Sequence, residues 1–246
     1  MPQKTALITG ANKGIGFEIA RQLAARSFHI ILAGRNKTGV QAAVDTISKA
    51  GGSCSALVMD VGDQTSIEAG FESVKSQFDS LDVLINNAAI LLDHSTAFLN
   101  ASADMIEDTL QVNALGPLYV TRTFLPLLGD GSRVINVSSS AGQICGGAGA
   151  YAPVYSMSKT LLNAISMQLS SALRPHNIVV NAMCPGWVRT EMGGSHAPRS
   201  IEEGADTAVW LATDAPLSIN GQFLKDKSSQ SWQLPLWPTL ISSKTL

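Results

Sequence analysis

Short apolar runs alternate with longer amphipathic stretches along almost the whole chain. The runs are rich in Ile, Val, Leu or Ala, and they occupy 5–9, 28–33, 54–59, 83–86, 133–137 and 178–183. Continuous apolarity without polar alternation is typical of strands that are buried on both faces, as in a parallel sheet. The stretches between the runs predict helices at 14–26, 37–50, 65–78, 102–128, 154–173 and 201–211. This order predicts an α/β fold with a doubly wound parallel sheet of about seven strands and helices on both faces.

The organisation of the chain indicates one domain. No internal linker interrupts the pattern, and 246 residues are enough for one large α/β domain. We therefore expect 1–225 to form a single domain that includes the active site. The segment 226–246 is rich in Ser and Pro without periodicity, and it is predicted to be a C-terminal tail. Pro117 falls inside the helix predicted at 102–128 and should kink or open it.

Charge and cysteine usage exclude several classes of protein. With 17 basic and 19 acidic residues, the net charge of -2 argues against a nucleic-acid binder, which needs a positive surplus to neutralise phosphates. The three cysteines lack the spacing of a disulfide framework or a zinc ribbon, so no metal site is predicted. The sequence shows neither a secretory signal pattern nor an apolar stretch that could span a bilayer. We expect a cytoplasmic protein that binds neither nucleic acid nor membrane.

A glycine-rich loop joins the first predicted strand to the first predicted helix. Gly10 permits a tight turn, Gly14 allows the backbone to approach a pyrophosphate, and Gly16 allows close packing of helix on strand. The helix N-terminus adds unpaired N–H groups and the positive end of its dipole. An ordinary glycine-rich turn is the alternative, but the place at the first strand–helix junction favours a dinucleotide site in a Rossmann-type fold. The predicted cofactor contacts in this loop are Gly10, Asn12, Lys13, Gly14, Ile15 and Gly16.

The spacing of these glycines, TGxxxGxG, resembles the short-chain dehydrogenase/reductase family. The resemblance covers 4–224, and six motifs occur in the order that the family has. Its implications for individual residues are given below together with what the residues themselves indicate.

Two basic residues indicate which nicotinamide cofactor is bound. The second predicted strand ends in Ala-Gly-Arg-Asn, without the carboxylate that would bind a ribose 2′-hydroxyl. Arg35 and Lys13 are placed instead to bind a 2′-phosphate, although two solvated surface charges remain the alternative. The resemblance implies NADP(H), because a basic residue at both positions is the usual NADP-preferring pattern. It also implies that Asp60 and Val61 contact the adenine, with a capping role as the alternative for Asp60.

Tyr155 and Lys159 are four residues apart at the start of a helical stretch and therefore share a face. Reduction of a carbonyl needs a proton at oxygen as hydride reaches carbon, and a free tyrosine has a pKa near 10. A lysine ammonium about 5 Å away would favour the phenolate by roughly 3 kcal/mol, or about two pKa units. The resemblance implies that Tyr155 is the proton donor and that Lys159 also binds the ribose.

Two more polar residues complete the predicted catalytic set. Three serines end the fifth predicted strand, where a hydroxyl faces the ligand crevice. The resemblance selects Ser139 to bind the substrate oxygen and leaves Ser138 and Ser140 to turn formation. It also implies that the backbone carbonyl of Asn113 holds a water in a proton relay, with an exposed surface Asn as the alternative.

Two further segments resemble family motifs that contact the cofactor. Asn87 and Ala88 belong to an NNAA sequence where the family has NNAG. The PGWVRT sequence after the sixth predicted strand resembles the segment that packs on the nicotinamide. The resemblance implies that its contacts are Pro185, Gly186, Val188 and Thr190.

The resemblance is strongest to the NADPH-dependent carbonyl reductase branch, which implies reduction of small ketones or aldehydes. A ketoacyl-thioester reductase and a non-catalytic NADPH-binding sensor are the alternatives. Most family members pair through their long fourth and fifth helices, whereas monomeric carbonyl reductases cover that face with a large insertion before the catalytic helix. The corresponding loop here is too short to do so, which implies a homodimer or homotetramer. An apolar substrate pocket is predicted from its loop residues, which are Ile90, Leu91, Leu92, Ile144, Cys145, Tyr151, Trp187 and Met192.

Overall fold

The structure is a computed structural model that describes residues 3–144 and 151–230. Its centre is an eight-stranded sheet with the order β3-β2-β1-β4-β5-β6-β7-β8. All neighbouring strands are parallel except β7 and β8, which form an antiparallel pair. The strands are β1 (Thr5–Thr9), β2 (His29–Gly34), β3 (Ser53–Val58), β4 (Leu81–Asn86), β5 (Leu128–Val137), β6 (Val179–Met183), β7 (Phe223–Lys225) and β8 (Ser228–Gln230).

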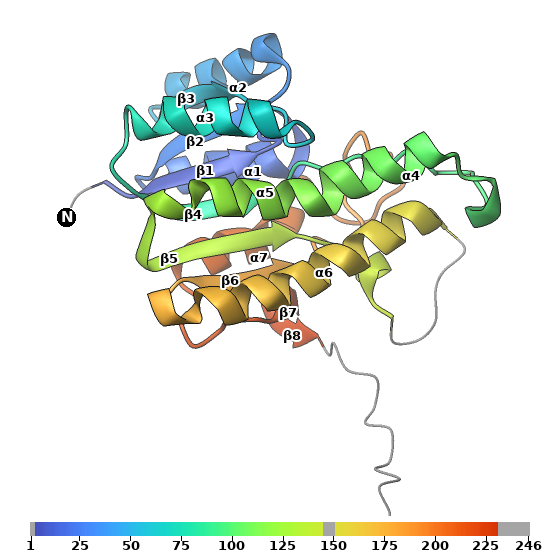
Figure 1. The fold of residues 1–246 in the computed structure, drawn as a ribbon. Helices are drawn as coiled ribbons and strands as arrows, with labels where there is room; N and C mark the ends of the chain where they lie inside the picture. The colour runs from blue at the N-terminus through green and yellow to red at the C-terminus, as the bar shows by residue number, and fades with distance from the viewer. Residues whose placement is uncertain (1–2, 145–150, 231–246) are drawn as a thin grey trace, which may run out of the picture.

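Helices cover both faces of the sheet, as predicted (Figure 1). One apolar layer contains Ile19, Val40 and Val209, from the helices α1, α2 and α7. The opposite layer contains residues of α3, α5 and α6, while α4 extends beyond the sheet (Figure 1). The helices are α1 (Gly14–Ala24), α2 (Lys37–Lys49), α3 (Gln64–Lys75), α4 (Ala103–Leu110), α5 (Gly116–Phe124), α6 (Pro153–Leu173) and α7 (Ile201–Thr213).

The strand β1, which has a neighbouring strand on each side, shows why the apolar runs lack alternation. All five residues of β1 are buried. Ala6 and Ile8 face the layer of α1 and α7, whereas Leu7 faces the layer of α3 and α5. The edge strand β3 differs, because only Leu57 in it is buried and Val58 is half exposed. The expectation that this run is buried on both faces was therefore wrong. An edge strand pairs with another strand on one side only, so its outer side is open to solvent.

The predicted helix at 102–128 is interrupted where Pro117 indicated an opening. α4 ends at Leu110, a π-helical turn covers Gln111–Leu115, and α5 starts at Gly116. Pro117 lies in the first turn of α5, where its missing N–H costs nothing. The helical segment also ends earlier than predicted, because β5 begins at Leu128, which pairs with Leu81.

The sheet continues beyond the predicted domain end at 225. Lys225 pairs with Ser228 across a tight turn, and β8 adds the eighth strand where about seven were predicted. Two ion pairs attach this turn to the rest of the domain: Arg199 with Asp226 at 2.7 Å and Lys227 with Asp206 at 2.8 Å. In the part of the chain that the structure describes, no helix has both the length and the apolar character needed to cross a membrane.

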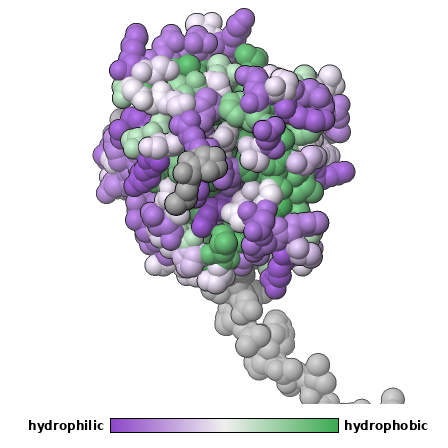
Figure 2. Space-filling model, turned by 90° about the vertical axis from the view of Figure 1, so that its left-hand side faces the viewer, coloured by the Kyte–Doolittle hydropathy of each residue, from purple (hydrophilic) through white to green (hydrophobic). Residues whose placement is uncertain are grey.

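The strand order places the ligand crevice. β1 pairs with β2 on one side and with β4 on the other, so the direction of winding reverses between β1 and β4. In open α/β sheets, ligands bind outside the carboxyl ends of the strands at such a reversal. The surface at the other end of the molecule, where the strands begin, is dominated by hydrophilic residues with smaller hydrophobic patches (Figure 2).

Candidate active site

Three of the predicted catalytic side chains lie together beyond the carboxyl end of β5. Lys159 is buried on α6, and its Nζ lies 5.6 Å from the centre of the Tyr155 ring. The same Nζ donates to the carbonyl oxygen of Val137, the last residue of β5, at 2.9 Å. Ser139 follows two residues later, and its side chain forms a hydrogen bond with Tyr155. The fold thus brings Ser139, Tyr155 and Lys159 into one cluster.

The site shifts the proton affinities of both Tyr155 and Lys159. Loss of solvation raises the pKa of Tyr155 to about 12, with a smaller push from Cys184, while the hydrogen bond with Ser139 acts in the opposite direction. Burial lowers the pKa of Lys159 to about 8. The expected lowering of the tyrosine pKa by the lysine charge is not found, because desolvation dominates at the phenol. A phenol that keeps its proton at neutral pH is suited to donate it.

The three consecutive serines have different surroundings. Ser138 is buried and donates to Oδ1 of Asn163 at 2.6 Å. The backbone N–H of Ser140 donates to Sγ of Cys184 at 3.1 Å. Ser139 Oγ accepts a hydrogen bond from the backbone N–H of Ala141 at 3.1 Å and also bonds Tyr155. Of the two side chains, Ser139 therefore lies next to Tyr155, whereas Ser138 is bonded to Asn163.

Asn113 lies within the π-helical turn and is completely buried. Its Oδ1 accepts from the N–H of Ile90 and its Nδ2 donates to the carbonyl of Ile90, both at 2.8 Å. Nδ2 also donates to Oγ of Ser158 on α6 at 3.0 Å. The alternative of an exposed surface Asn was wrong. The side chain is fully engaged, so any role in proton relay is left to the backbone carbonyl, and π-helical turns often occur at functional sites.

Two residues near the cluster were missed by the sequence interpretation. Cys184 is buried after β6, and its Sγ accepts from the N–H groups of Ser140 at 3.1 Å and Gly186 at 3.3 Å. Asp93 is also buried, and its Oδ2 accepts from the N–H of Val154 at 2.6 Å. The position of Cys184 directly before the Pro-Gly pair is a signal that could have identified it. Asp93 has no local signal, because its partner lies 61 residues away.

The glycine loop lies directly against the end of β4. A Cβ atom on Gly10, whose φ is +64°, would lie 2.8 Å from Cα of Ala88. A Cβ on Gly16 would lie 2.3 Å from Nδ2 of Asn87. This Nδ2 donates to the carbonyls of Thr9 at 3.0 Å and Gly10 at 3.1 Å. Asn87 therefore holds the loop in shape, and a larger residue than glycine would displace it.

The N-terminus of α1 is free to bind an anionic group. Within residues 3–144 and 151–230, no side chain caps this helix at Lys13, and its first turn has no acidic residue. Its unpaired N–H groups and the positive end of the dipole favour a phosphate. Thr190 faces the same place, since a Cβ on Gly14 would lie 3.6 Å from its Cγ2. These features fit the pyrophosphate of a dinucleotide.

The residues predicted to bind the adenosine end have acidic neighbours. Lys13 forms an ion pair with Glu191, and Nη1 of Arg35 lies 3.8 Å from Oδ2 of Asp60. Both basic side chains are more than half exposed, so they can rotate toward a 2′-phosphate. Asp60 also makes a turn, because its Oδ1 accepts from the N–H of Gly62 at 2.9 Å.

The other predicted cofactor contacts differ in accessibility. Asn12 reaches the turn after β2, where its Oδ1 lies 3.5 Å from a Cβ built on Gly34. Val61 and Val188 are buried. The side chain of Val188 packs on Gly204 of α7, so only its backbone is left to face the crevice. Gly186 has a φ of +80°, a left-handed conformation that favours glycine after Pro185.

The residues predicted to line an apolar substrate pocket differ in their exposure. Ile90 and Leu91 are partly buried. The indole Nε1 of Trp187 donates to the carbonyl of Gly193 at 2.8 Å, which fixes the ring. Cys145 lies outside the described residues. The members of this set that are exposed are Leu92, Ile144, Tyr151, Trp187 and Met192.

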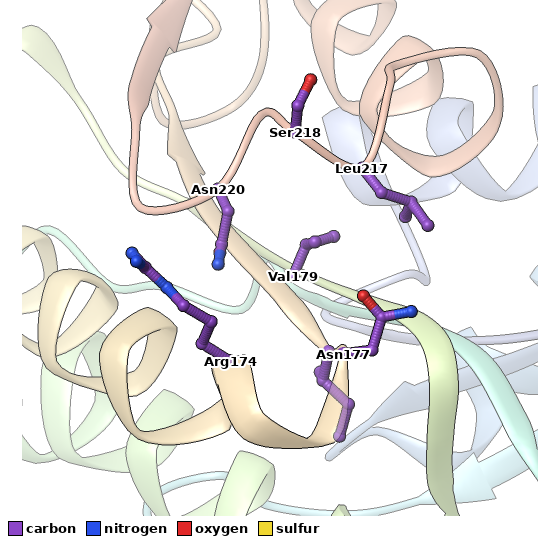
Figure 3. Close-up of a pocket in the computed structure, with 7 residues that line it drawn as sticks. Arg174, Asn177, Val179, Leu217, Ser218 and Asn220 are labelled. Carbon is purple, nitrogen blue, oxygen red and sulfur yellow. The ribbon is translucent and has the colours of Figure 1, made fainter.

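A separate hollow lies at the opposite end of the strands, near the start of β6 (Figure 3). Its polar lining is already engaged in part. Asn177 donates to Oδ1 of Asp130 at 2.7 Å, and Oδ1 of Asn220 accepts from the N–H of Val180 at 2.8 Å. The predicted catalytic residues do not line it. The crevice at the carboxyl ends of the strands is therefore the better candidate for the active site.

Comparisons with known proteins agree with this geometry. Carbonyl reductase [NADPH] 1 of Sus scrofa is 34% identical over 281 residues, an alignment that covers 94% of this chain and 95% of the relative. The crystal structure of NADPH-bound carbonyl reductase from chicken fatty liver has a TM-score of 0.80 at 27% identity, covering 92% of this chain and 97% of that one. A short chain dehydrogenase from Burkholderia cenocepacia in complex with NADP has a TM-score of 0.83 at 26% identity, covering 90% and 95%. The model of the short chain dehydrogenase family matches residues 4–200, and the chain therefore belongs to the short-chain dehydrogenase family.

Proposed function

We propose that this protein reduces ketones or aldehydes to alcohols with NADPH. The chain is an NADP(H)-dependent oxidoreductase of its family, related over nearly its whole length to carbonyl reductases. The observation that carries the proposal is the cluster of Ser139, Tyr155 and Lys159, in which the phenol retains its proton. The crevice with the uncapped end of α1 supplies the place for the cofactor phosphates.

The residues of the cluster divide the work of carbonyl reduction. Bound NADPH supplies the hydride that the carbonyl carbon receives. Ser139 donates a hydrogen bond to the carbonyl oxygen, which holds that oxygen next to the Tyr155 hydroxyl. Tyr155 transfers its proton to the oxygen as negative charge develops there, and the product is the alcohol. Lys159 binds the ribose, and its ammonium stabilises the phenolate that remains until Tyr155 is reprotonated.

The surroundings of the crevice favour substrates with apolar or aromatic groups. Trp187, Tyr151 and Leu92 are exposed apolar or aromatic residues in segments predicted to cover the site. A ketoacyl-thioester reductase would need a basic patch for its acidic carrier. Arg133 instead donates to the carbonyls of Leu211 and Ala215 at 2.9 and 2.8 Å. Arg174 lines the hollow near the start of β6, at the other end of the strands. This distribution favours a free small-molecule carbonyl.

The test is NADPH oxidation by the purified chain with a panel of aryl ketones and aldehydes. We expect turnover with NADPH that greatly exceeds turnover with NADH. Tight NADPH binding without oxidation by any carbonyl would instead identify a sensor, and activity limited to acyl thioesters would identify the ketoacyl alternative.

The cellular setting is part of the same proposal. Cys54 and Cys184 are free thiols in the structure, which is consistent with a reducing compartment such as the cytoplasm. We propose that the protein acts there as a homodimer or homotetramer, for which a test is given below.

A further inference from the structure

The helix that carries Tyr155 and Lys159 has no cap of its own. α6 starts at Pro153, and the preceding Ala152 has left-handed backbone angles, with φ 47° and ψ 62°. Ala152 has no side chain that could bond the free N–H groups of the first turn. A buried helix end of this kind needs acceptors from another part of the chain.

Asp93 supplies these acceptors from the loop after β4. Its side chain is completely buried, and Oδ2 accepts from the N–H of Val154 at 2.6 Å and of Tyr155 at 3.4 Å. Among the described residues, its Oδ1 is a buried oxygen without a hydrogen-bond partner. The carboxyl group therefore contacts the backbone of the predicted proton donor directly.

The loop that carries Asp93 is itself held in place. Asn113 bonds both the N–H and the carbonyl of Ile90, three residues before Asp93. A second attachment follows Asp93, where a hydrogen bond of 2.7 Å joins Nδ1 of His94 to Oη of Tyr151. The loop is thus attached to the π-helical turn through Asn113. It contacts the beginning of α6 through Asp93 and the residue Tyr151 just before this helix through His94.

We propose that Asp93 is a positioning residue, which sets the place of Tyr155 relative to Ser139 and the substrate oxygen. The inference rests on the proposed function, because it assigns Asp93 a role in the same reaction. Proton transfer requires hydrogen-bond distance, and a displacement of about 1 Å can cost a large factor in rate. The glycine loop and the N-terminus of α1 make no hydrogen bond with Asp93, whose acceptor oxygen, within the described part of the chain, bonds only Val154 and Tyr155, so we expect NADPH affinity to change little when Asp93 is replaced.

The experiment compares two substitutions at Asp93 with a matched control. Asp93→Ala removes the acceptor, whereas Asp93→Asn keeps a carbonyl oxygen in its place. Asp63→Ala is the control, because Asp63 caps α3 by accepting from the N–H of Thr65 at 2.9 Å, away from the cluster. We expect Asp93→Ala to lower kcat by about tenfold or more, with NADPH Kd and substrate KM within about threefold of the wild type. Asp93→Asn should retain kcat within about threefold, and Asp63→Ala should leave it unchanged.

A second measurement does not depend on activity. Hydrogen exchange at the amides of Val154 and Tyr155 should accelerate by about tenfold or more in Asp93→Ala, but not in Asp93→Asn or Asp63→Ala. If the wild type reduces no carbonyl, the proposed function fails while the exchange result still decides whether Asp93 holds the helix end. If Asp93→Ala does not fold, Asp93→Val, which also lacks an acceptor, takes its place with the same expected loss.

Two outcomes would overturn the inference. One is a folded Asp93→Ala or Asp93→Val variant with normal kcat. The other is an Asp93→Asn variant that loses as much kcat as Asp93→Ala, because a retained acceptor would then be irrelevant.

Discussion

Tyr155 and Lys159 are displaced from their ordinary proton affinities in ways that make separate predictions. Tyr155 has a pKa of about 12 and Lys159 a pKa of about 8, each mainly because burial disfavours the charged form. Both shifts keep the neutral form over a wider pH range than in water. At neutral pH the tyrosine is protonated and the lysine still carries its proton.

The first prediction concerns the Tyr155 hydroxyl. Tyr155→Phe keeps the ring that packs on α6 and removes the group that donates the proton. We expect kcat to fall by at least about 100-fold, with melting temperature and NADPH affinity little changed. The control is Tyr151→Phe, which loses the bond to His94 but leaves the Asp93 contact with α6 in place, so it should mainly alter substrate preference. Near-normal turnover in Tyr155→Phe, or a dead Tyr151→Phe, would contradict the assignment.

The second prediction follows from the lowered pKa of Lys159. Between pH 8 and 10.5 the unfolded chain binds a proton at this lysine that the folded chain has released, so stability rises with pH in that window. Lys159→Met lacks this rise. Near neutral pH we expect the variant to have the higher free energy of unfolding, because it has no buried charge at this position. This difference in free energy between variant and wild type should shrink by about 3 kcal/mol by pH 10.5, as measured by urea unfolding. A difference between the two proteins that does not change with pH would show that Lys159 is not desolvated.

The third prediction concerns cofactor selection by Arg35 and Lys13. Replacing either by Ala should weaken NADPH binding by roughly 10- to 100-fold, since one charge-assisted phosphate contact is worth about 1.5 to 3 kcal/mol. NADH binding should hardly change. Glu191→Gln is the control, because it removes the acidic partner of Lys13 and should not weaken NADPH binding. Equal losses for NADPH and NADH would show that neither basic residue recognises the 2′-phosphate.

At the scale of elements, the site depends on how closely a short turn approaches α6. The 3-10 turn Ser140–Gly142 follows Ser139, and the carbonyl of Gly142 accepts from Thr160 Oγ1 at 3.1 Å. A Cβ on Gly142 would lie 2.6 Å from the backbone carbon of Lys159 and 2.8 Å from its carbonyl oxygen. Because both atoms belong to the helix backbone, neither can move aside cheaply.

The fourth prediction uses this close approach. Gly142→Ala should push the turn and Ser139 away from Tyr155, with a loss of about tenfold or more in kcat and about 1 to 3 kcal/mol in stability. Gly129→Ala is the matched control. Gly129 is exposed on β5 with no atom within 4 Å of the added methyl group, so its effect should stay within about 0.5 kcal/mol. Unchanged activity in Gly142→Ala would mean that the turn does not position Ser139.

The elements also show what the sequence could predict. Apolar runs located the parallel strands because burial on both faces leaves a continuous pattern, as in β1. β3 had the same pattern although it lies at the edge, since periodicity does not report a strand's neighbours. Pro117 predicted the interruption after α4, but the π-helical form arises from packing around Asn113, which no local pattern encodes.

The same limit applies within the site. Tyr155 and Lys159 could be paired from their spacing, because one helix fixes both. The lowered tyrosine pKa that the sequence predicted depends on a charge alone, whereas the structure adds the loss of solvation that outweighs it. Asp93 could not be found, because its function depends on a contact between two loops that are distant in the chain.

At the scale of the whole molecule, α6 presents exposed apolar side chains on its outer surface. Figure 1 shows α4, α5 and α6 on that side. Leu161 and Met167 of α6 are both more than a third exposed. These two exposed apolar side chains on α6 favour association with a second copy of the chain.

The fifth prediction is therefore a dimer or tetramer in light scattering. Leu161→Lys should shift the protein toward the monomer, because it places a charge in the expected interface. Val58→Lys, on the edge strand β3, is the control and should leave the assembly intact. A wild-type particle at the monomer mass of 25.9 kDa would contradict the expectation.

The position of β1 has a consequence for synthesis on the ribosome. β1 pairs with β2 at once, but its other edge must await β4, whose residues begin at Leu81. Until then, the nascent chain exposes a strand with an apolar centre and unpaired backbone groups, a surface to which other chains can add. The glycine loop also leaves the ribosome long before α6. The half of the protein that binds the cofactor is thus made first, and the half that donates the proton completes the sheet around it.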